Sequence, residues 1–401
     1  MATVTDFHKL IRYLVFFLAL FFLLPVYRIA SRKKEDIVGF ACDWFRGNIK
    51  YLYEEMKKYE GIKIYLVTKY KKELARIKSS NIVAYYDMDV TKIPLFLRTS
   101  VWITDMGSWE IPIVGTINRI FMRLFGFPYR QRKHRSKWVD VWHGGMGFKY
   151  VGREEMLADY DVGFVTSEFF RRYYSRKSGI SHKLKITGNP RTDPLIKRAM
   201  SRENVLKDIG VPPKRRNILY APTRPHKERK AFFPWEQTDK IIEDLERFCD
   251  KNDSNFLVRL HPWYYTRTLK ETEKLKQKIE QSKNIFDVSS EKHIDVQGIL
   301  YITDVLITDW SSIANDFILL DRPIIFLDVE LPVQEFKLTP NDRVGYIVKD
   351  KKEFFEKLQE AIDRPKLFER KRKTLIRKLY KHLDGNSSKR CAQEIIKLLR
   401  Q

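Results

Sequence analysis

Short apolar, β-branched segments alternate regularly with amphipathic helical segments, and this alternation is the strongest constraint on the fold. The first strand-like series is DIVGFACD, IKIYLVT, NIVAYY, SVWIT, VDVWHG, DVGFVTS and LKITG. The second is NILYAPT, NFLVRLHP, NIFDVS, VLITD and PIIFLD, with long helices expected at 235–250 and 268–281. Strands interleaved with helices form right-handed βαβ units around a parallel sheet. The sequence therefore predicts an α/β protein with two Rossmann-like domains that face each other across a cleft.

The length of 401 residues also suits two domains. We place the first at 32–199 and the second at 200–401, with a polar, helical stretch near Pro194 to Gly210 leading from one to the other. The basic tail from Lys351 is expected to be helical, and the final helix is a candidate to pack back on the first domain.

The charge balance points to anionic partners. The chain has 76 Lys and Arg against 51 Asp and Glu, which gives a net charge of +25. Nucleic acid, anionic lipid and phosphorylated substrates all fit such a balance. No helix-turn-helix, zinc-finger or aromatic-rich RNA-binding signature is present, so we do not expect nucleic acid. The three cysteines, Cys42, Cys249 and Cys391, lack metal-ligand spacing and fit a reducing compartment.

Residues 1–31 are predicted to associate with a membrane. They contain a 15-residue apolar run, Tyr13 to Tyr27, with basic residues on both sides. A spanning helix usually needs about 20 apolar residues, so we favour a shallow anchor with the body on the cytoplasmic side. A true signal anchor is the alternative. A secretory signal peptide fits less well, because no small-residue cleavage site follows and the trailing flank is basic.

A second membrane candidate is the basic amphipathic helix expected within 111–135. Apolar residues recur on one face from Ile117 to Phe125, with Arg119 and Arg123 opposite. Such a helix can lie in the membrane interface, on the cytoplasmic face like the N-terminal segment. The same pattern also suits a solvated helix packed on its own domain.

Within the second series, the segment Val305 to Phe317 combines a buried strand with a polar turn and a helix start. Ser311 and Ser312 are expected to cap that helix, and its free N–H groups also suit a phosphate. Asp316 lies four residues after Ser312, on the same helix face. Ligands in open α/β sheets bind at the carboxyl ends of the strands, where this turn is predicted to lie. An ordinary N-cap is the alternative interpretation.

Four further polar clusters follow predicted strands, in residues 141–152, 187–194, 220–225 and 258–262. In the first, His143 is a candidate general base, and the glycines after it allow a ligand close to the backbone. The second cluster presents Arg191, and the third ends with Thr223 and Arg224. In the fourth, strand alternation places Arg259 and His261 on one face. Each cluster has a plain turn-chemistry explanation, but together they predict a site for a pyrophosphate-bearing substrate.

Asp87-Met88-Asp89 matches the D-x-D pattern with which some glycosyltransferases bind a metal and a nucleotide diphosphate. Three residues are a weak pattern, so we assign no metal ligands.

Residues of about 100 to 390 resemble the CDP-glycerol glycerophosphotransferase family, the teichoic-acid primases and polymerases. Five family motifs occur in order: WHG-x-x-x-K, G-x-P-R-x-D, YAPT, R-x-HP and TD-aromatic-SS-x-x-x-D. In this chain they are Trp142-His143-Gly144 with Lys149, Gly188 to Asp193, Tyr220 to Thr223, Arg259 to Pro262, and Thr308 to Asp316. There are two departures. Gly145 and Met146 stand where the family usually has Thr-Pro, and Trp310 replaces the commoner Tyr.

The resemblance implies a GT-B fold, with an acceptor-side first domain and a nucleotide-binding second domain. It implies transfer of a polyol phosphate, glycerol phosphate above all, from a CDP-activated donor to a lipid-linked glycan of the undecaprenyl type, releasing CMP at the cytoplasmic membrane face. His143 and His261 would be catalytic, and we expect no cofactor and no obligatory divalent ion. Expected substrate-binding residues are Trp142, Gly144, Gly145, Met146, Arg191, Pro222, Thr223, Arg259, Leu260, Ser311, Ser312 and Asp316.

Two other functions remain open at the level of the sequence. A GT-B glycosyltransferase that uses a nucleotide sugar would share the fold and the phosphate-binding turn. A polybasic membrane-binding protein without enzymatic activity would explain the charge and the apolar N-terminus. The nucleotide released, CMP or instead UDP or GDP, separates the first alternative from the favoured function.

Overall fold

The computed structural model describes residues 35–87, 89–105, 136–142, 148, 160–213, 216–223, 233–261, 270–289, 295–330 and 338–401. The predicted membrane segment 1–31 and the amphipathic helix within 111–135 lie outside these residues. Within the described ranges, none of the helices combines the length and the apolar character that a membrane crossing requires.

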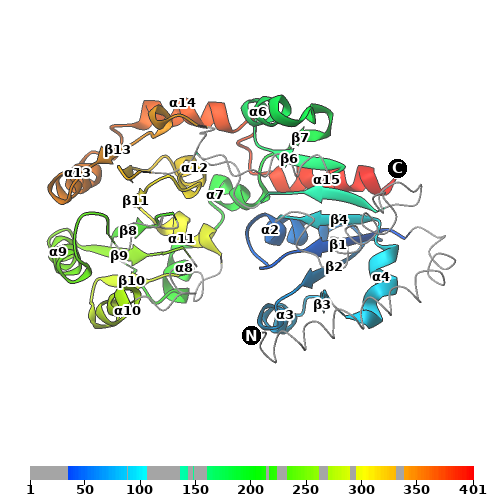
Figure 1. The fold of residues 1–401 in the computed structure, drawn as a ribbon, viewed down its shortest axis with the longest axis horizontal. Coiled ribbons are helices and arrows are strands. Elements are labelled where there is room, and N and C mark those ends of the chain that lie inside the picture. Colours follow the sequence, from blue (N-terminus) through cyan, green and yellow to red (C-terminus); the bar gives the residue numbers. More distant parts are fainter. Residues whose placement is uncertain are drawn as a thin grey trace, which may run out of the picture.

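The first half of the molecule is built on a parallel sheet with the strand order β3-β2-β1-β4-β5-β6-β7 (Figure 1). The order reverses between β1 and β4, which is the switch point of a doubly wound sheet, where ligands bind outside the carboxyl ends. The strands are β1 Ile37–Ala41, β2 Lys63–Thr68, β3 Ala84–Tyr86, β4 Val101–Thr104, β5 Lys137–Asp140, β6 Val162–Val165 and β7 Leu184–Ile186.

The second half has its own parallel sheet, in the order β10-β9-β8-β11-β12-β13. Its strands are β8 Arg216–Tyr220, β9 Ser254–Val258, β10 Ile285–Asp287, β11 Val305–Thr308, β12 Ile324–Leu327 and β13 Tyr346–Val348. The predicted α/β architecture with parallel sheets is confirmed. Strand β13 was not expected, because its apolar run is short. Gly345 before it allows close approach, since a Cβ there would collide with the Ile324 carbonyl.

Among the described residues, helices lie between most successive strands as predicted, and their apolar spacing explains which face they bury. In α9, Thr238–Lys251, the buried residues Ile241, Leu245 and Cys249 recur every four residues. Helix α10 is Lys270–Gln281. The other helices are α2 Gly47–Met56, α3 Lys71–Ser79, α4 Ile93–Arg98, α6 Glu168–Ser178, α7 Asp193–Lys197, α8 Arg202–Asp208, α11 Val296–Ile302, α12 Ile313–Phe317, α13 Lys351–Asp363, α14 Glu369–Leu379 and α15 Ser387–Leu399.

The last helix returns to the first half of the molecule, where α15 (red) lies beside the first sheet (Figure 1). Its Cys391, Ala392 and Ile395 are buried in the same core cluster as Val38 of β1. The carboxylate of Asp193 accepts the backbone N–H groups of Ser387 and Ser388, at 2.8 and 2.7 Å, and so caps the helix start. Sequence beyond 380 is therefore part of the first sheet's packing.

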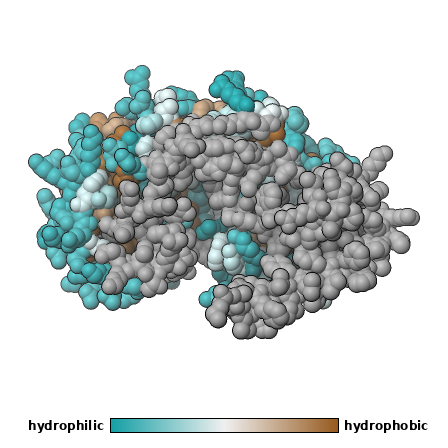
Figure 2. Space-filling view, in the orientation of Figure 1, coloured by the Kyte–Doolittle hydropathy of each residue, from teal (hydrophilic) through white to brown (hydrophobic). Residues whose placement is uncertain are grey.

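Among the described residues, one hydrophobic cluster contains side chains from both sheets. It contains Trp142 and Val165 from the first half together with Leu219, Leu306 and Phe326 from the second. The visible outer surface of the second half is mainly hydrophilic, with apolar residues in small patches (Figure 2). The shared cluster thus packs side chains from both halves into one core.

The start of α12 differs from expectation. Ser312 has φ −64° and ψ −12°, which is already helical, and its side chain makes no capping hydrogen bond. The Ser311 hydroxyl lies 3.5 Å from the Ile313 N–H, the outer limit of a hydrogen bond. An N-cap residue has an extended backbone, so the predicted cap is wrong for Ser312, whereas Ser311 accepts the Ile313 N–H in a long hydrogen bond. Because α12 has only five residues, its dipole is also small.

Candidate active site

The carboxyl ends of three neighbouring strands bring the second-half motifs together. Strand β8 pairs with β9 on one side and β11 on the other. Their following turns are residues 221–223, 259–261 and 309–312. These motifs therefore lie at one edge of the second sheet, as predicted from the sequence.

A buried carboxylate that the sequence analysis left without a role organises the turn after β8. Asp309 has no exposed surface. It accepts the Thr223 backbone N–H at 2.8 Å and the Thr223 hydroxyl at 2.9 Å. Beside it, the Thr308 hydroxyl donates to the Ala221 carbonyl at 2.7 Å. Thr223 and the buried Pro222 are therefore fixed in place by β11, and the Thr223 hydroxyl proton is already donated to Asp309 rather than directed at a ligand.

The turn after β9 presents one cation and one imidazole. The Arg259 N–H continues the strand pairing by donating to the Tyr220 carbonyl at 2.9 Å, and its guanidinium donates to the Val288 carbonyl at 2.6 Å. Leu260 is buried, whereas His261 is exposed at the edge. The half-buried Arg259 and the exposed His261 thus lie on the face opposite Leu260, as the strand alternation predicts.

Arg191 and Asp316 form an ion pair between the two halves. Arg191 lies in the 3₁₀ turn η7, Pro190–Thr192, after β7, and Asp316 lies in α12. Arg191 Nε is 2.8 Å and Nη2 is 3.2 Å from the two carboxylate oxygens of Asp316. Their side chains are 10% and 5% exposed. The Gln297 amide donates to Asp316 at 3.4 Å. Both residues were predicted to contact the donor, and here they contact each other.

A second polar contact joins the halves at the start of α11. Asp295 accepts the Gln297 N–H at 3.3 Å and so caps this helix. Its other oxygen accepts Lys50 Nζ at 2.8 Å and the Tyr51 hydroxyl at 2.9 Å, both from α2. Burial and the nearby Asp295 charge raise the pKa of Tyr51, so the phenol stays protonated as the donor.

The turn after β5 contains a residue with an unusual backbone conformation. Trp142 has φ +51°, a conformation rare for a bulky residue. Its N–H donates to Asp140 at 3.2 Å, and its ring packs at 5.7 Å from the Tyr174 ring. His143, Gly144, Gly145 and Met146 lie outside the described residues, so their predicted roles are not placed by the structure.

Phe148, the next described residue, packs into the second half. Its ring meets Trp310 edge to face at 5.9 Å and Phe326 at 6.0 Å. The Trp310 indole N–H donates to the Val329 carbonyl at 2.8 Å, and the Arg343 guanidinium lies 4.3 Å from its ring centroid. Trp310, the residue that departs from the family pattern, therefore packs Phe148 against the turn that carries Ser311 and Ser312.

Acidic residues lie at the carboxyl edge of the first sheet, where Asp105 follows β4 and Asp140 ends β5. Burial raises the pKa of Asp105 to about 7, Arg46 opposes that rise, and Asp140 adds to it. Asp87 is also buried, and Asp89 lies two residues further on. Over the described ranges, no group of three or more His, Cys, Asp or Glu side chains is arranged to hold a metal ion.

The Asp105 carboxyl gives a testable pH dependence. A pKa raised from 3.8 to about 7 means that the folded protein binds this proton more tightly than the unfolded chain. Its contribution is therefore fully favourable below pH 4 and is lost as the pH rises to 7, by up to about 4 kcal/mol. We expect Asp105→Asn to remove this loss and to be more stable than wild type at pH 8.

Urea unfolding of wild type and Asp105→Asn between pH 4.5 and 8 measures the effect. Asp36→Asn, at an exposed carboxylate before β1, is the control. A difference between wild type and Asp105→Asn that stays constant over this range would contradict the prediction.

Known proteins share both the sequence and the fold of this chain. The sequence profile of the family described as CDP-Glycerol:Poly(glycerophosphate) glycerophosphotransferase matches residues 24–397. The teichoic acid ribitol-phosphate polymerase TarL of Staphylococcus aureus is 28% identical over 395 residues, covering 90% of this chain and 63% of that protein. The teichoic acid glycerol-phosphate primase of Bacillus subtilis is 25% identical over 280 residues, covering 64% and 67%.

The solved structure of the wall teichoic acid polymerase TagF superposes with a TM-score of 0.69 at 18% identity, covering 100% of this chain and 99% of that one. At that identity the likeness supports the fold alone. The chain spans about three fifths of the length of the ribitol-phosphate polymerases that it matches. The profile match includes both sheets and all five motifs, and the chain therefore belongs to the CDP-glycerol:poly(glycerophosphate) glycerophosphotransferase family.

Proposed function

We propose that this protein transfers a polyol phosphate, glycerol phosphate first, from a CDP-activated donor to a hydroxyl of a lipid-linked glycan or polyol-phosphate acceptor, in the synthesis of a teichoic-acid-like or capsular polymer. The family match over residues 24–397 carries this proposal. Relatives named as glycerol-phosphate primases and ribitol-phosphate polymerases support a CDP-polyol donor. A structure of TagF soaked with CDPG supports glycerol as the first donor to test.

The donor diphosphate would lie at the shared edge of β8, β9 and β11. Arg259 and His261 supply positive charge and hydrogen-bond donors there, and the hydroxyls of Ser311 and Ser312 lie on the neighbouring turn. Since the α12 dipole is small, individual N–H groups and hydroxyls would hold the phosphate rather than a helix field. Thr223 would act through the shape of its turn, because its two donors bind Asp309.

In the transfer step, the acceptor oxygen would form a bond to the phosphorus that bears the polyol. The bond from that phosphorus to the bridging oxygen would break, and CMP would leave. His143 would take the proton of the acceptor hydroxyl. The cationic side chains would offset the charge that develops on the leaving phosphate, so that catalysis rests on positioning and electrostatic stabilisation.

The Arg191–Asp316 pair would define the wall of this site between the halves. A buried carboxylate needs a compensating charge, and Arg191 supplies it for Asp316. A donor polyol that approaches Asp316 would meet a carboxylate of fixed orientation. Asp316 would thus keep its predicted contact with the donor. Arg191 would hold the Asp316 carboxylate in place, in addition to any contact with the phosphates.

We further propose a GT-B arrangement with an acceptor-side first domain, 32–199, and a nucleotide-binding second domain, 200–401. Residues 1–31 and the helix within 111–135 would attach the protein to the anionic cytoplasmic face of the membrane. No cofactor is part of the proposal, and the basic side chains at the site would take the place of a divalent ion.

Purified full-length protein incubated with a crude lipid acceptor and a donor panel tests the function. We expect CMP release with CDP-glycerol, less with CDP-ribitol, and no UDP from UDP-sugars. EDTA should leave the rate unchanged. Loss of activity in EDTA would instead favour a metal-binding role for Asp87 and Asp89. UDP release would identify a glycosyltransferase, whereas no nucleotide release with any donor would favour the membrane-binding alternative.

A further inference from the structure

We propose that Asn48 is a positioning residue that fixes the turn from which the chain enters His143. The inference rests on the proposed function, in which His143 is the base. Asn48 lies in the first turn of α2 and is 2% exposed. Asn48 precedes His143 by almost a hundred residues and has no motif around it, so its sequence context predicts no role.

The Asn48 side chain makes its hydrogen bonds to backbone groups. Its amide nitrogen donates to the Val141 carbonyl at 2.7 Å and also to the Trp142 carbonyl. Its oxygen accepts the Arg191 N–H at 3.1 Å. A primary amide can donate two hydrogen bonds through its nitrogen and accept others through its oxygen, all from one planar group. No hydroxyl or carboxylate could make the same set.

The Val141 and Trp142 carbonyls are the last backbone acceptors before His143. Because a peptide unit is planar, fixing the Trp142 carbonyl also fixes the direction in which the chain leaves this residue. Trp142 has φ +51°, which an L-residue with a bulky side chain seldom adopts without support. Asp140 binds its N–H and Asn48 binds its carbonyl, so the unusual conformation is held from both sides.

The same amide connects this turn to the second half of the molecule. Asn48 accepts the Arg191 N–H, and the Arg191 guanidinium pairs with Asp316 at 2.8 Å. Asp316 lies on the helix that follows Ser311 and Ser312. One short chain of contacts thus runs from the turn before the base to the predicted phosphate site. A reacting group misplaced by about 1 Å can cost 10²-fold in rate, so such a connection has a catalytic consequence.

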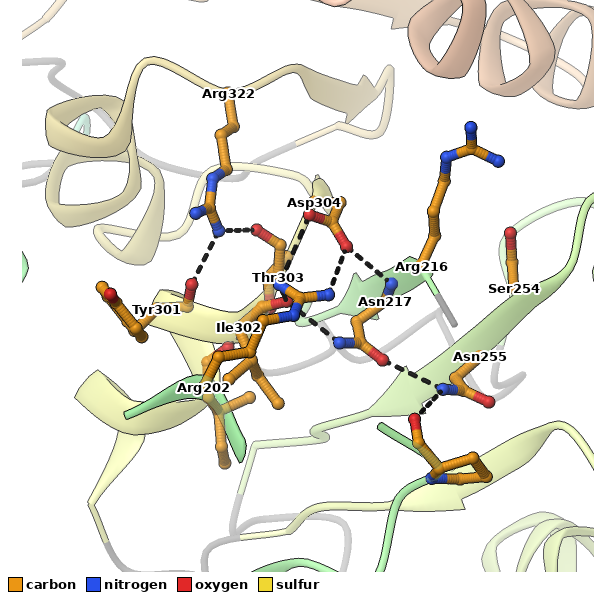
Figure 3. A network of polar contacts seen from close by, with 12 residues as sticks. Arg202, Arg216, Asn217, Ser254, Asn255, Tyr301, Ile302, Thr303, Asp304 and Arg322 are labelled. Carbon is orange, nitrogen blue, oxygen red and sulfur yellow. Dashed lines mark hydrogen bonds and ion pairs between the residues drawn. The ribbon is translucent and has the colours of Figure 1, made fainter. Parts of the chain in front are cut away.

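Asn217 provides a matched control far from this edge. It lies at the amino end of β8, is 0% exposed, and belongs to a polar network with Asn255, Asp304 and Arg202 (Figure 3). Its amide donates to the Ile302 carbonyl at 3.0 Å and its oxygen accepts the Asn255 amide at 3.1 Å. Asn→Asp therefore removes a buried donor of the same kind at both positions.

The experiment compares Asn48→Asp, Asn48→Ala and Asn217→Asp in the full chain. At a temperature where each variant is folded, we expect the two Asn48 variants to lower kcat about 100-fold, with a much smaller change in the KM for CDP-glycerol, which enters only through Arg191. Hydrogen exchange should rise in peptides covering 136–148 and 187–194 and stay unchanged in 216–223. Asn217→Asp should lower the melting temperature while kcat is retained.

Hydrogen exchange separates this inference from the proposed function, since it requires no turnover. Unchanged exchange over 136–148, or unchanged kcat despite faster exchange, would overturn the positioning role. If both Asn48 variants fail to fold while Asn217→Asp folds, Asn48 supports the whole fold and the proposal is also wrong. An inactive wild type would overturn the function alone, and exchange would still decide whether Asn48 holds the turn.

Discussion

His143→Ala is expected to lower the turnover number by about 10²–10⁴-fold and to leave the affinity for CDP-glycerol nearly unchanged. The reason is that the base acts on the acceptor hydroxyl, whereas the donor is held by turns of the second sheet. Those turns, residues 221–223, 259–261 and 309–312, follow strands β8, β9 and β11 of the second sheet, whereas His143 comes after β5 of the first sheet.

Initial rates of CMP release at saturating donor, together with donor affinity by calorimetry, measure the two effects separately. His182→Ala is the control, because His182 is exposed in a 3₁₀ turn before β7. His261→Ala should instead weaken donor binding as well as turnover. Loss of donor affinity in His143→Ala, with turnover retained at saturation, would remove His143 from the base role.

The strand and helix pattern of this chain was predictable because parallel strands buried on both faces are nearly continuous apolar runs. Each predicted strand overlaps a strand of the structure, from DIVGFACD at β1 to PIIFLD at β12, although β5 begins two residues before VDVWHG and already ends at Asp140. The prediction missed β13, Tyr346–Val348, because three residues carry too little periodic signal. It also misjudged Ser312, because a polar residue at a helix start does not reveal whether its own backbone is extended or already helical.

The site was predictable only at the level of motifs. Strand ends place Thr223, His261 and Ser311 at one edge, and the sequence shows where strands end. Asn48 and Asp309 were missed for different reasons. Asp309 stood inside a recognised motif, but its partner Thr223 is 86 positions away. Asn48 binds only backbone of distant segments, so its role depends on tertiary contacts that no local pattern encodes.

Asp316→Ala is expected to lower the free energy of unfolding by about 3–5 kcal/mol. The substitution leaves the Arg191 guanidinium buried without its carboxylate, and the cost of that uncompensated charge exceeds the value of the ion pair itself. The Gln297 amide would lose its acceptor as well. Because Arg191 and Asp316 come from different halves, we expect the variant also to loosen the contact between the two sheets.

Urea unfolding at pH 7 measures this loss against Glu273→Ala, which removes a surface ion pair with Lys276 whose side chains are 53% and 37% exposed. That control should change stability by less than about 1 kcal/mol. The double variant Arg191→Met/Asp316→Leu should recover much of the stability, since no buried charge remains, and yet stay inactive. If Asp316→Ala cost no more than the surface control, the pair would be open to solvent in the working protein, and Arg191 would be available to the donor phosphates after all.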